Sequence, residues 1–362
     1  MFELTNEQRK CFGLAVVPKG WEKVKVKPSP YDYFETFAYL DGNKVRKVIT
    51  VSEENRPMYC EYQMDAELSE DRKMLLPKTA KGKPKLFSTS NLLRVTPYGM
   101  TVQFGEQSVY LVNRTTDQTF YRSEYDGVTL DGIEAFGHWV DEWCADTGDK
   151  ELAEIEEFAE SKRQHQKYRE GDFFRFRINR NLYGYGRILI DFSQMRKDKI
   201  PFWDIFMGKP LCVAVYHIAT DRGDVQPGQL ENLPMLPSHM IMDNIFYYGE
   251  CTVIGNKPIS EAGQNYPVHY GRPINVGEDG VRYQCGKTFV ALDNEKVLYK
   301  YFENNGIGWR LNVKLPILRK CIDAKSNQPY WEMYYPGTVN YDLRNPKFSA
   351  ELKQIQKQMG II

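Results

Sequence analysis

The sequence predicts an α+β protein of two domains, each built on a largely antiparallel or mixed β-sheet. Three observations predict this class. The first 130 residues consist mainly of short segments in which apolar and polar residues alternate, as in strands. Residues 131–160 change to helical spacing and carry eleven acidic residues, and strand-like alternation returns after residue 170. We expect residues 1–148 to form a β-rich domain that ends in a helix. Residues 149–362 should form an acidic connector helix, an α+β domain and a C-terminal amphipathic helix.

Length and composition restrict the class of protein further. A chain of 362 residues is long enough for two domains that each bury a core. Its 48 basic and 48 acidic residues cancel, so the net charge favours neither nucleic acid nor membrane as a partner. The seven cysteines contain no CxxC pair, which favours reduced thiols in a cytoplasmic protein. The first ten residues lack the apolar core of a signal peptide, and no run of about 18 apolar residues occurs.

The first domain starts with a helix and continues with strands. Thr5 and Gln8 have the spacing of a capping box, which predicts a short helix that Gly13 ends. Residues 34–40 and 44–51 should pair across Asp41-Gly42-Asn43, a strong hairpin signal. Further strands are expected at residues 24–26, 58–64, 100–104, 109–112 and 119–122.

A basic segment interrupts these strands. Residues 72–94 contain seven basic residues and no acidic one, and residues 77–84 within them indicate an exposed loop. Such a loop could follow the phosphates of a nucleic acid. Short basic runs are more often solvated connections between strands, so we do not expect nucleic-acid binding from this run alone.

The acidic region predicts two helices. Residues 133–145 place Ile133, Phe136, Val140 and Trp143 on one face, and a second helix should run from Thr147 or Asp149 to about Tyr168. The acidic side chains permit two interpretations. They form either a solvated surface over the core or an anionic surface that meets a basic partner.

The stretch Gly171–Asp191 predicts a β-hairpin, around which we organise the second domain. Apolar and polar residues alternate along its first arm, namely Phe174, Phe176 and Ile178 with Arg175, Arg177 and Asn179. Asn179-Arg180-Asn181 should form the turn, because asparagine tolerates a positive φ.

The returning arm of this hairpin has two glycines on one face. Gly184 and Gly186 share that face with Ile188 and Ile190, so we expect a bulge or a second backbone lying close against them. The opposite face carries residue types that are enriched at protein–protein hot spots, namely Tyr183, Tyr185 and Arg187. Alternatively, the tyrosines and glycines form a tight corner of the core.

Two motifs in the hairpin resemble a known family. Gly171-Asp172-Phe173 and the run Tyr183–Ile188 (YGYGRI) are similar to the opening of the immunity protein 26 family of bacterial polymorphic toxin systems. The resemblance extends over about residues 168–318 and is strongest in its first twenty residues. It implies a cytoplasmic protein that binds and neutralises a cognate protein toxin, and it brings no catalytic residue and no cofactor. Some relatives carry an organophosphate-hydrolase label, which implies a metal-assisted phosphoester hydrolase as the alternative.

For the toxin-binding hypothesis, the expected contact residues lie on and near the hairpin: Tyr183, Tyr185, Arg187, Trp203, Arg175 and Arg177. We expect structural roles for Gly171, Asp172, Gly184 and Gly186. A toxin that is a nuclease should have a basic active face, which would favour docking on the acidic residues 131–160 instead.

The hydrolase alternative needs three or four converging ligands, and residue spacing alone indicates no such set, although ligands can converge in the fold. The chain contains none of the HExxH, GxSxG or P-loop motifs. His217 lies within the apolar strand predicted at residues 211–218, so we expect a core residue; His239 and His269 lie in predicted loops. No three or four ligands have metal-site spacing, and no metal site is predicted. Three His, Asp or Glu side chains converging in one pocket would favour the hydrolase.

The remaining elements follow from local patterns. Residues 201–206 predict a compact apolar turn or short helix, and strands are expected at residues 245–254, 281–285, 288–292 and 307–311. Asn345-Pro346 should start the last helix, which Gly360 ends. Its apolar stripe consists of Phe348, Leu352, Ile355 and Met359.

Overall fold

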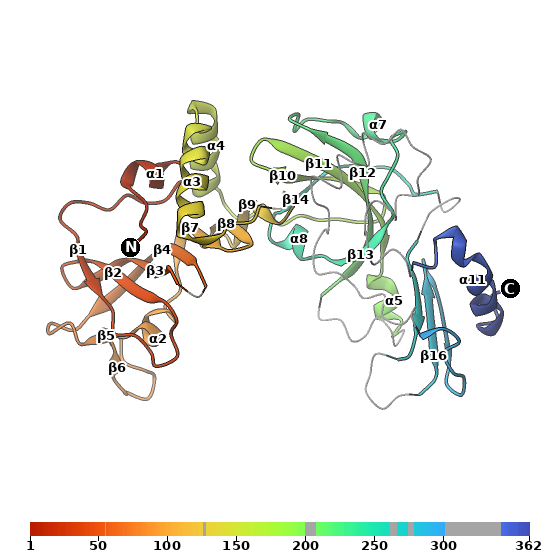
Figure 1. Cartoon of the computed structure of the whole chain (residues 1–362), viewed down its shortest axis with the longest axis horizontal. Helices are drawn as coiled ribbons and strands as arrows, with labels where there is room; N and C mark the ends of the chain where they lie inside the picture. Colours follow the sequence, from red (N-terminus) through yellow and green to blue (C-terminus); the bar gives the residue numbers. More distant parts are fainter. Residues whose placement is uncertain (55, 126–127, 200–207, 261–265, 274–278, 301–341) are drawn as a thin grey trace. The chain divides into compact units, whose positions relative to one another are not determined.

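The structure, a computed structural model, describes residues 1–54, 56–125, 128–199, 208–260, 266–273, 279–300 and 342–362. The chain divides into two compact units, Met1–Gln164 and His165–Ile362, which run from red to yellow and from green to blue in Figure 1. Antiparallel sheets dominate the described residues of both units, and a helix lies close to the C-terminus. The predicted α+β class is confirmed.

The first unit contains a nine-stranded antiparallel sheet. Seven strands follow the order β1-β2-β3-β4-β7-β8-β9, and the short hairpin β5–β6 branches from β4. The β2–β3 hairpin turns at Asp41-Gly42-Asn43 as predicted, with Gly42 at φ +60°. The strands are β1 (Glu22–Lys25), β2 (Glu35–Asp41), β3 (Lys44–Ser52), β4 (Met58–Leu68), β5 (Met74–Leu76), β6 (Lys85–Leu86), β7 (Tyr98–Gly105), β8 (Ser108–Asn113) and β9 (Gln118–Arg122).

Helices and aromatic side chains complete the core of the first unit. Thr5 and Gln8 form the predicted capping box, and Phe12 stacks on Trp143 with ring centres 5.5 Å apart. Phe136 and Val140 are fully buried beside them. The helices are α1 (Asn6–Lys10), α2 (Thr89–Leu92), the 3-10 turn η1 (Ser123–Tyr125), α3 (Gly132–Ala145) and α4 (Asp149–Glu160).

Helix α4 differs from its prediction in length and in place. It ends at Glu160, well before Tyr168, and Ser161 has an extended backbone with ψ 152°. Ile155 is fully buried in the core of the first unit, against which Phe158 and Ala159 also pack. The helix expected to open the second domain therefore belongs to the first unit, whose last residue is Gln164.

The second unit contains a five-stranded and a three-stranded antiparallel sheet. The larger sheet has the order β13-β12-β11-β10-β14, with the predicted hairpin β10–β11 near its middle. Its strands are β10 (Asp172–Asn179), β11 (Leu182–Asp191), β12 (Pro210–Thr220), β13 (His239–Met242) and β14 (Cys251–Asn256). The smaller sheet consists of β15 (Val268–Gly271), β16 (Val281–Cys285) and β17 (Thr288–Leu292).

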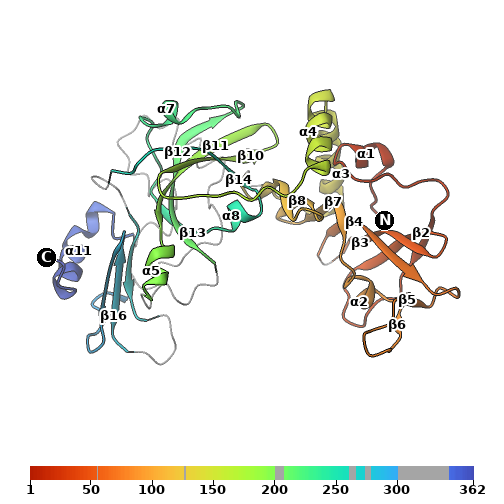
Figure 2. The ribbon, with the colours of Figure 1, turned by 180° about the vertical axis from the view of Figure 1, so that it is seen from behind.

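Short helices accompany these sheets. They are α5 (Ser193–Lys197), α7 (Pro227–Leu230), α8 (Asn244–Tyr247), the 3-10 turn η4 (Pro346–Phe348) and α11 (Ser349–Gln358). The predicted closing helix is confirmed. Its Ile355 and Met359 are buried against Tyr270 and Val281 of the small sheet, and both views show α11 beside β16 (Figures 1 and 2).

One predicted strand is wrong in the second unit. Residues 245–254 were expected to be a single strand, but they contain the end of α8 and the start of β14. Gly249 at φ +69° turns the chain between these two elements. Residues 201–206 and 307–311 lie outside the described residues. Within the described part of the chain, no helix is both long and apolar enough to cross a membrane.

Candidate functional site

The β10–β11 hairpin is the centre of the candidate site. Its two arms pair in antiparallel register, with Phe174 opposite Gly186 and Phe176 opposite Gly184. The side chain of Asn179 accepts a hydrogen bond from the backbone N–H of Asn181 at 3.1 Å. None of residues 179–181 has a positive φ, so the expected reason for asparagine here is wrong: its side chain stabilises the turn.

Aromatic rings of β10 cover the glycine face of β11. A Cβ atom at Gly184 would lie 2.4 Å from the ring of Phe176, and one at Gly186 would lie 2.3 Å from the ring of Phe174. The same Cβ at Gly186 would come within 2.8 Å of the backbone oxygen of Ala214 in β12. The register between β11 and β12 shifts between the two glycines. These glycines make room for rings that lie across the strand.

Gly171 and Asp172 fix the beginning of the hairpin to the end of β14. Gly171 has φ +85°, and a Cβ there would lie 2.1 Å from the backbone oxygen of Lys257. The carboxylate of Asp172 is buried and accepts hydrogen bonds from the backbone N–H of Arg169 at 2.8 Å and from Asn256 Nδ2 at 2.7 Å. Both residues therefore have structural contacts in this unit.

Tyr185 does not face outward, and that expectation is wrong. Its side chain is fully buried with Phe173 and Tyr216, and Val225 and Leu230 lie in the same cluster. Its hydroxyl group donates a hydrogen bond to the backbone oxygen of Arg222 at 2.6 Å, and burial raises its pKa. The segment that follows β12 therefore covers this part of the sheet. The alternation of residues within β11 did not predict this cover.

Tyr183, at the edge of that cluster, has two guanidinium groups close to its ring. The Cζ atoms of Arg175 and Arg177 are 5.1 Å and 5.2 Å from its ring centre, and all three side chains are half-buried. Arg175 Nη1 donates a hydrogen bond to the backbone oxygen of Gly223, and Arg177 Nη1 donates one to that of Arg180 at 2.7 Å. We call Arg175, Arg177 and Tyr183 the Arg–Tyr–Arg group.

Arg187 is engaged within the unit. Its Cζ atom lies 4.5 Å from the ring centre of Phe173, and its Nη2 atom donates to the backbone oxygens of Lys257 at 2.9 Å and Pro258 at 3.0 Å. Trp203 lies outside the described residues. Of the six predicted contact residues, the structure brings together the three of the Arg–Tyr–Arg group as a partly exposed set.

Comparison with known protein families agrees with the motifs of this hairpin. Residues 169–276 match the family model of immunity protein 26. The matched segment contains the five-stranded sheet and ends sooner than the predicted limit of about 318. The first unit lies outside the match. Neither the curated proteins nor the solved structures contain a match to the chain.

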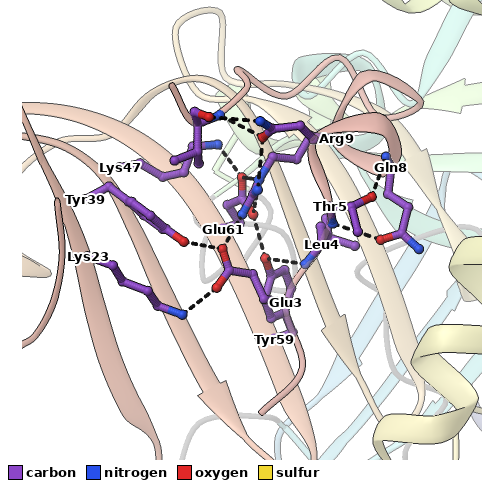
Figure 3. A network of polar contacts seen from close by, with 12 residues as sticks. Glu3, Leu4, Thr5, Gln8, Arg9, Lys23, Tyr39, Lys47, Tyr59 and Glu61 are labelled. Carbon is purple, nitrogen blue, oxygen red and sulfur yellow. Dashed lines mark hydrogen bonds and ion pairs between the residues drawn. The ribbon is translucent and has the colours of Figure 1, made fainter. Parts of the chain in front are cut away.

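The first unit contains a buried polar network that was not predicted from the sequence (Figure 3). Glu61 in β4 is 0% exposed and accepts hydrogen bonds from Arg9 Nε at 2.8 Å, Tyr59 Oη at 2.5 Å and Lys47 Nζ. Lys47 is 1% exposed, and its Nζ also donates to the backbone oxygen of Ala15 at 2.5 Å. Burial lowers the pKa of Lys47 against the opposing attraction of Glu61.

Glu3 extends the network toward the surface. It accepts hydrogen bonds from Arg9 at 2.7 Å, from Lys23 at 2.5 Å and from Tyr39. Burial alone would raise the pKa of Glu3, but these donors outweigh it and lower the pKa. The network joins the first fifteen residues to β2, β3 and β4, so its position indicates a structural role. The local signal was in the predicted strand at residues 44–51, where Lys47 alternates with Ile49 and Val51; Glu61 alternates with Tyr59 and Gln63 and gave no such signal.

The hydrolase alternative predicted three converging ligands. Across the described ranges, no three His, Cys, Asp or Glu side chains lie close enough to hold a metal ion. His217 and His269 are 8% and 9% exposed, and burial lowers the pKa of each to about 4. His217 is therefore a core residue, as the sequence indicated, and His269 belongs to strand β15 rather than to a loop.

These two imidazoles predict that acid destabilises the second unit. In the unfolded chain each binds a proton near pH 6.5, whereas in the folded unit each stays neutral until about pH 4. The unfolded state binds more protons between these values, so stability falls as pH is lowered through this range. We expect a loss of about 2 kcal/mol per imidazole between about pH 7 and pH 5. Denaturant unfolding at both pH values, with a His217→Gln variant that loses part of the difference, would measure this effect. An equal difference in wild type and variant would contradict it.

Proposed function

We propose that the protein binds a cognate protein toxin and neutralises it by occluding the toxin's active site. The observation that carries this proposal is the match of residues 169–276 to immunity protein 26. Occlusion requires no catalytic group, only a surface that is formed before the toxin arrives. The hairpin of the second unit suits such a surface, because the packing against both of its faces holds it in one conformation before binding.

The Arg–Tyr–Arg group is the docking surface that we propose on this sheet. Tyrosine and arginine are the residue types that most often dominate binding energy at protein interfaces. The bonds of Arg175 and Arg177 to backbone oxygens hold these side chains in place, so less conformational entropy is lost on binding. Two positive charges beside an aromatic ring suit an acidic patch on the toxin.

The acidic helices α3 and α4 are the alternative docking surface. Nine carboxylates on these helices or at their ends are exposed. In the described part of the chain, none of these nine forms an ion pair. A toxin with a basic active face, such as a nuclease, would favour this surface. The nine residues are Asp131, Glu134, Asp141, Glu142, Asp146, Asp149, Glu156, Glu157 and Glu160.

Co-expression with the toxin encoded beside this protein tests the proposal, and co-purification of the pair is the expected result. Tyr183→Ala should weaken the complex by about 2 kcal/mol, or roughly thirtyfold in Kd, because it removes the central ring of the group. The control Tyr247→Ala removes a tyrosine that is 52% exposed on α8 and should leave the affinity within about threefold.

Other outcomes would relocate or remove the docking surface. If Glu156→Lys with Glu157→Lys abolishes the complex while Tyr183→Ala does not, the toxin docks on α4. If no complex forms and the chain gives no protection from the toxin, the proposed function is wrong. Tyr185→Ala is unsuitable as a docking test, because truncating a fully buried aromatic side chain costs about 3–5 kcal/mol of stability.

A further inference from the structure

The β5–β6 hairpin of the first unit carries a positive charge that the proposed function does not use. Its strands pair with Met74 opposite Leu86 and Leu75 opposite Lys85, and a loop of residues 77–84 connects them. Figure 1 shows the hairpin extending from the sheet beside α2. This loop contains Lys78, Lys81 and Lys83, all of them exposed.

Hydrogen bonds within the loop give it a defined conformation. The backbone N–H of Thr79 donates to the oxygen of Lys83 at 3.0 Å, and the N–H of Lys83 donates to Thr79 Oγ1 at 2.9 Å. Gly82, with φ +74°, donates its N–H to the oxygen of Thr79 at 2.7 Å. These hydrogen bonds close the turn, and the exposed lysines of the loop are attached to this ordered backbone.

Further cations lie near the base of the hairpin, where α2 follows β6. Lys27 is exposed, and its backbone oxygen accepts the N–H of Thr89 at 3.0 Å, so it lies beside the start of α2. Residues 72–94 contain no acidic side chain. Among the residues that the structure describes, six nearby cations form no ion pair: Lys27, Lys78, Lys81, Lys83, Lys85 and Arg94. We call these six residues the basic hairpin surface.

We propose that the basic hairpin surface binds the phosphate backbone of a nucleic acid without regard to base sequence. Lysine contacts phosphates as a point charge, and each contact releases a counterion. Five of the six cations are lysines, a residue type that is depleted at protein–protein interfaces. The loop tip has no aromatic or large aliphatic side chain that could enter a bilayer. A nucleic acid thus fits this surface better than an acidic protein or a membrane.

The test measures binding of the full chain to two short duplex DNAs of unrelated sequence. We expect both to bind at about 50 mM salt with similar affinity and to dissociate as salt is raised to about 200 mM. The variant Lys81→Gln with Lys83→Gln should bind at least tenfold more weakly at about 0.1 M salt. The slope of log K against log salt should also become shallower by about 2. The matched control, Lys353→Gln with Lys357→Gln, changes two exposed lysines of α11 and should bind like the wild type.

Several results would overturn this inference. It is wrong if neither duplex binds at low salt, or if the Lys81 and Lys83 variant binds as tightly as the control variant. Equal or tighter binding to polyglutamate would assign the surface to an acidic protein. Equal or tighter binding to vesicles that contain phosphatidylserine would assign it to a membrane. Each side chain changed in the hairpin is exposed, so circular dichroism should show an unaltered fold.

Discussion

Replacing Glu61 with glutamine is expected to lower the free energy of unfolding of the first unit by about 3–5 kcal/mol. The substitution keeps the shape of the side chain and removes its negative charge. Arg9 would keep Glu3 as a charged partner, but Lys47, which is 1% exposed, would keep only neutral acceptors such as the backbone oxygen of Ala15. Removing one partner of a buried ion pair strongly destabilises the folded state, because the other charge stays buried without a counter-charge.

Hydrogen exchange of the β3 and β4 amides in the full chain measures this effect without interference from the second unit. Glu35→Gln is the matched control. Glu35 pairs with Lys25 on the surface, where the two side chains are 50% and 59% exposed, so its loss should cost about 0–1 kcal/mol. Equal effects of the two substitutions would show that the charge of Glu61 contributes nothing beyond a surface ion pair.

This network shows why sequence alone could not locate every important residue. Thr5 with Gln8 and the turn at Asp41-Gly42-Asn43 follow from neighbouring residues, and both were predicted correctly. Arg9, Lys47 and Glu61 are far apart in the chain and meet only when α1 packs on β3 and β4. No local period or motif encodes such a meeting.

The same limit applies to the candidate site. Alternation along β10 and β11 correctly predicted the hairpin, and the structure brings Arg175, Arg177 and Tyr183 together on it. It could not show that Val225 and Leu230 would cover Tyr185, because they lie beyond the next strand, β12. Period-two patterns identify the two faces of a strand, whereas burial of a face depends on chain that is distant in sequence.

Replacing Gly186 with valine is expected to destabilise the second unit by more than about 3 kcal/mol and to prevent its folding at physiological temperature. A Cβ at this position would lie 2.3 Å from Phe174 Cζ and 2.8 Å from the backbone oxygen of Ala214. The ring of Phe174 packs edge to face on Phe246 with centres 5.5 Å apart, so its movement would disturb that contact. The oxygen of Ala214 belongs to strand β12, which pairs with β11 and β13 on its two sides, so it could move only with the sheet.

Gly228→Val is the control for the valine side chain itself. A Cβ at Gly228, which is exposed in α7, meets no atom within 4 Å, so this variant should change stability by no more than about 0.5 kcal/mol. Thermal unfolding, with hydrogen exchange assigned to β10, β11 and β12, measures both variants in the full chain. If Gly186→Val folds as well as Gly228→Val, the rings of β10 are free to move away. In that case the hairpin is not the rigid platform that the proposed docking surface requires, because the position of Tyr183 depends on the same strand.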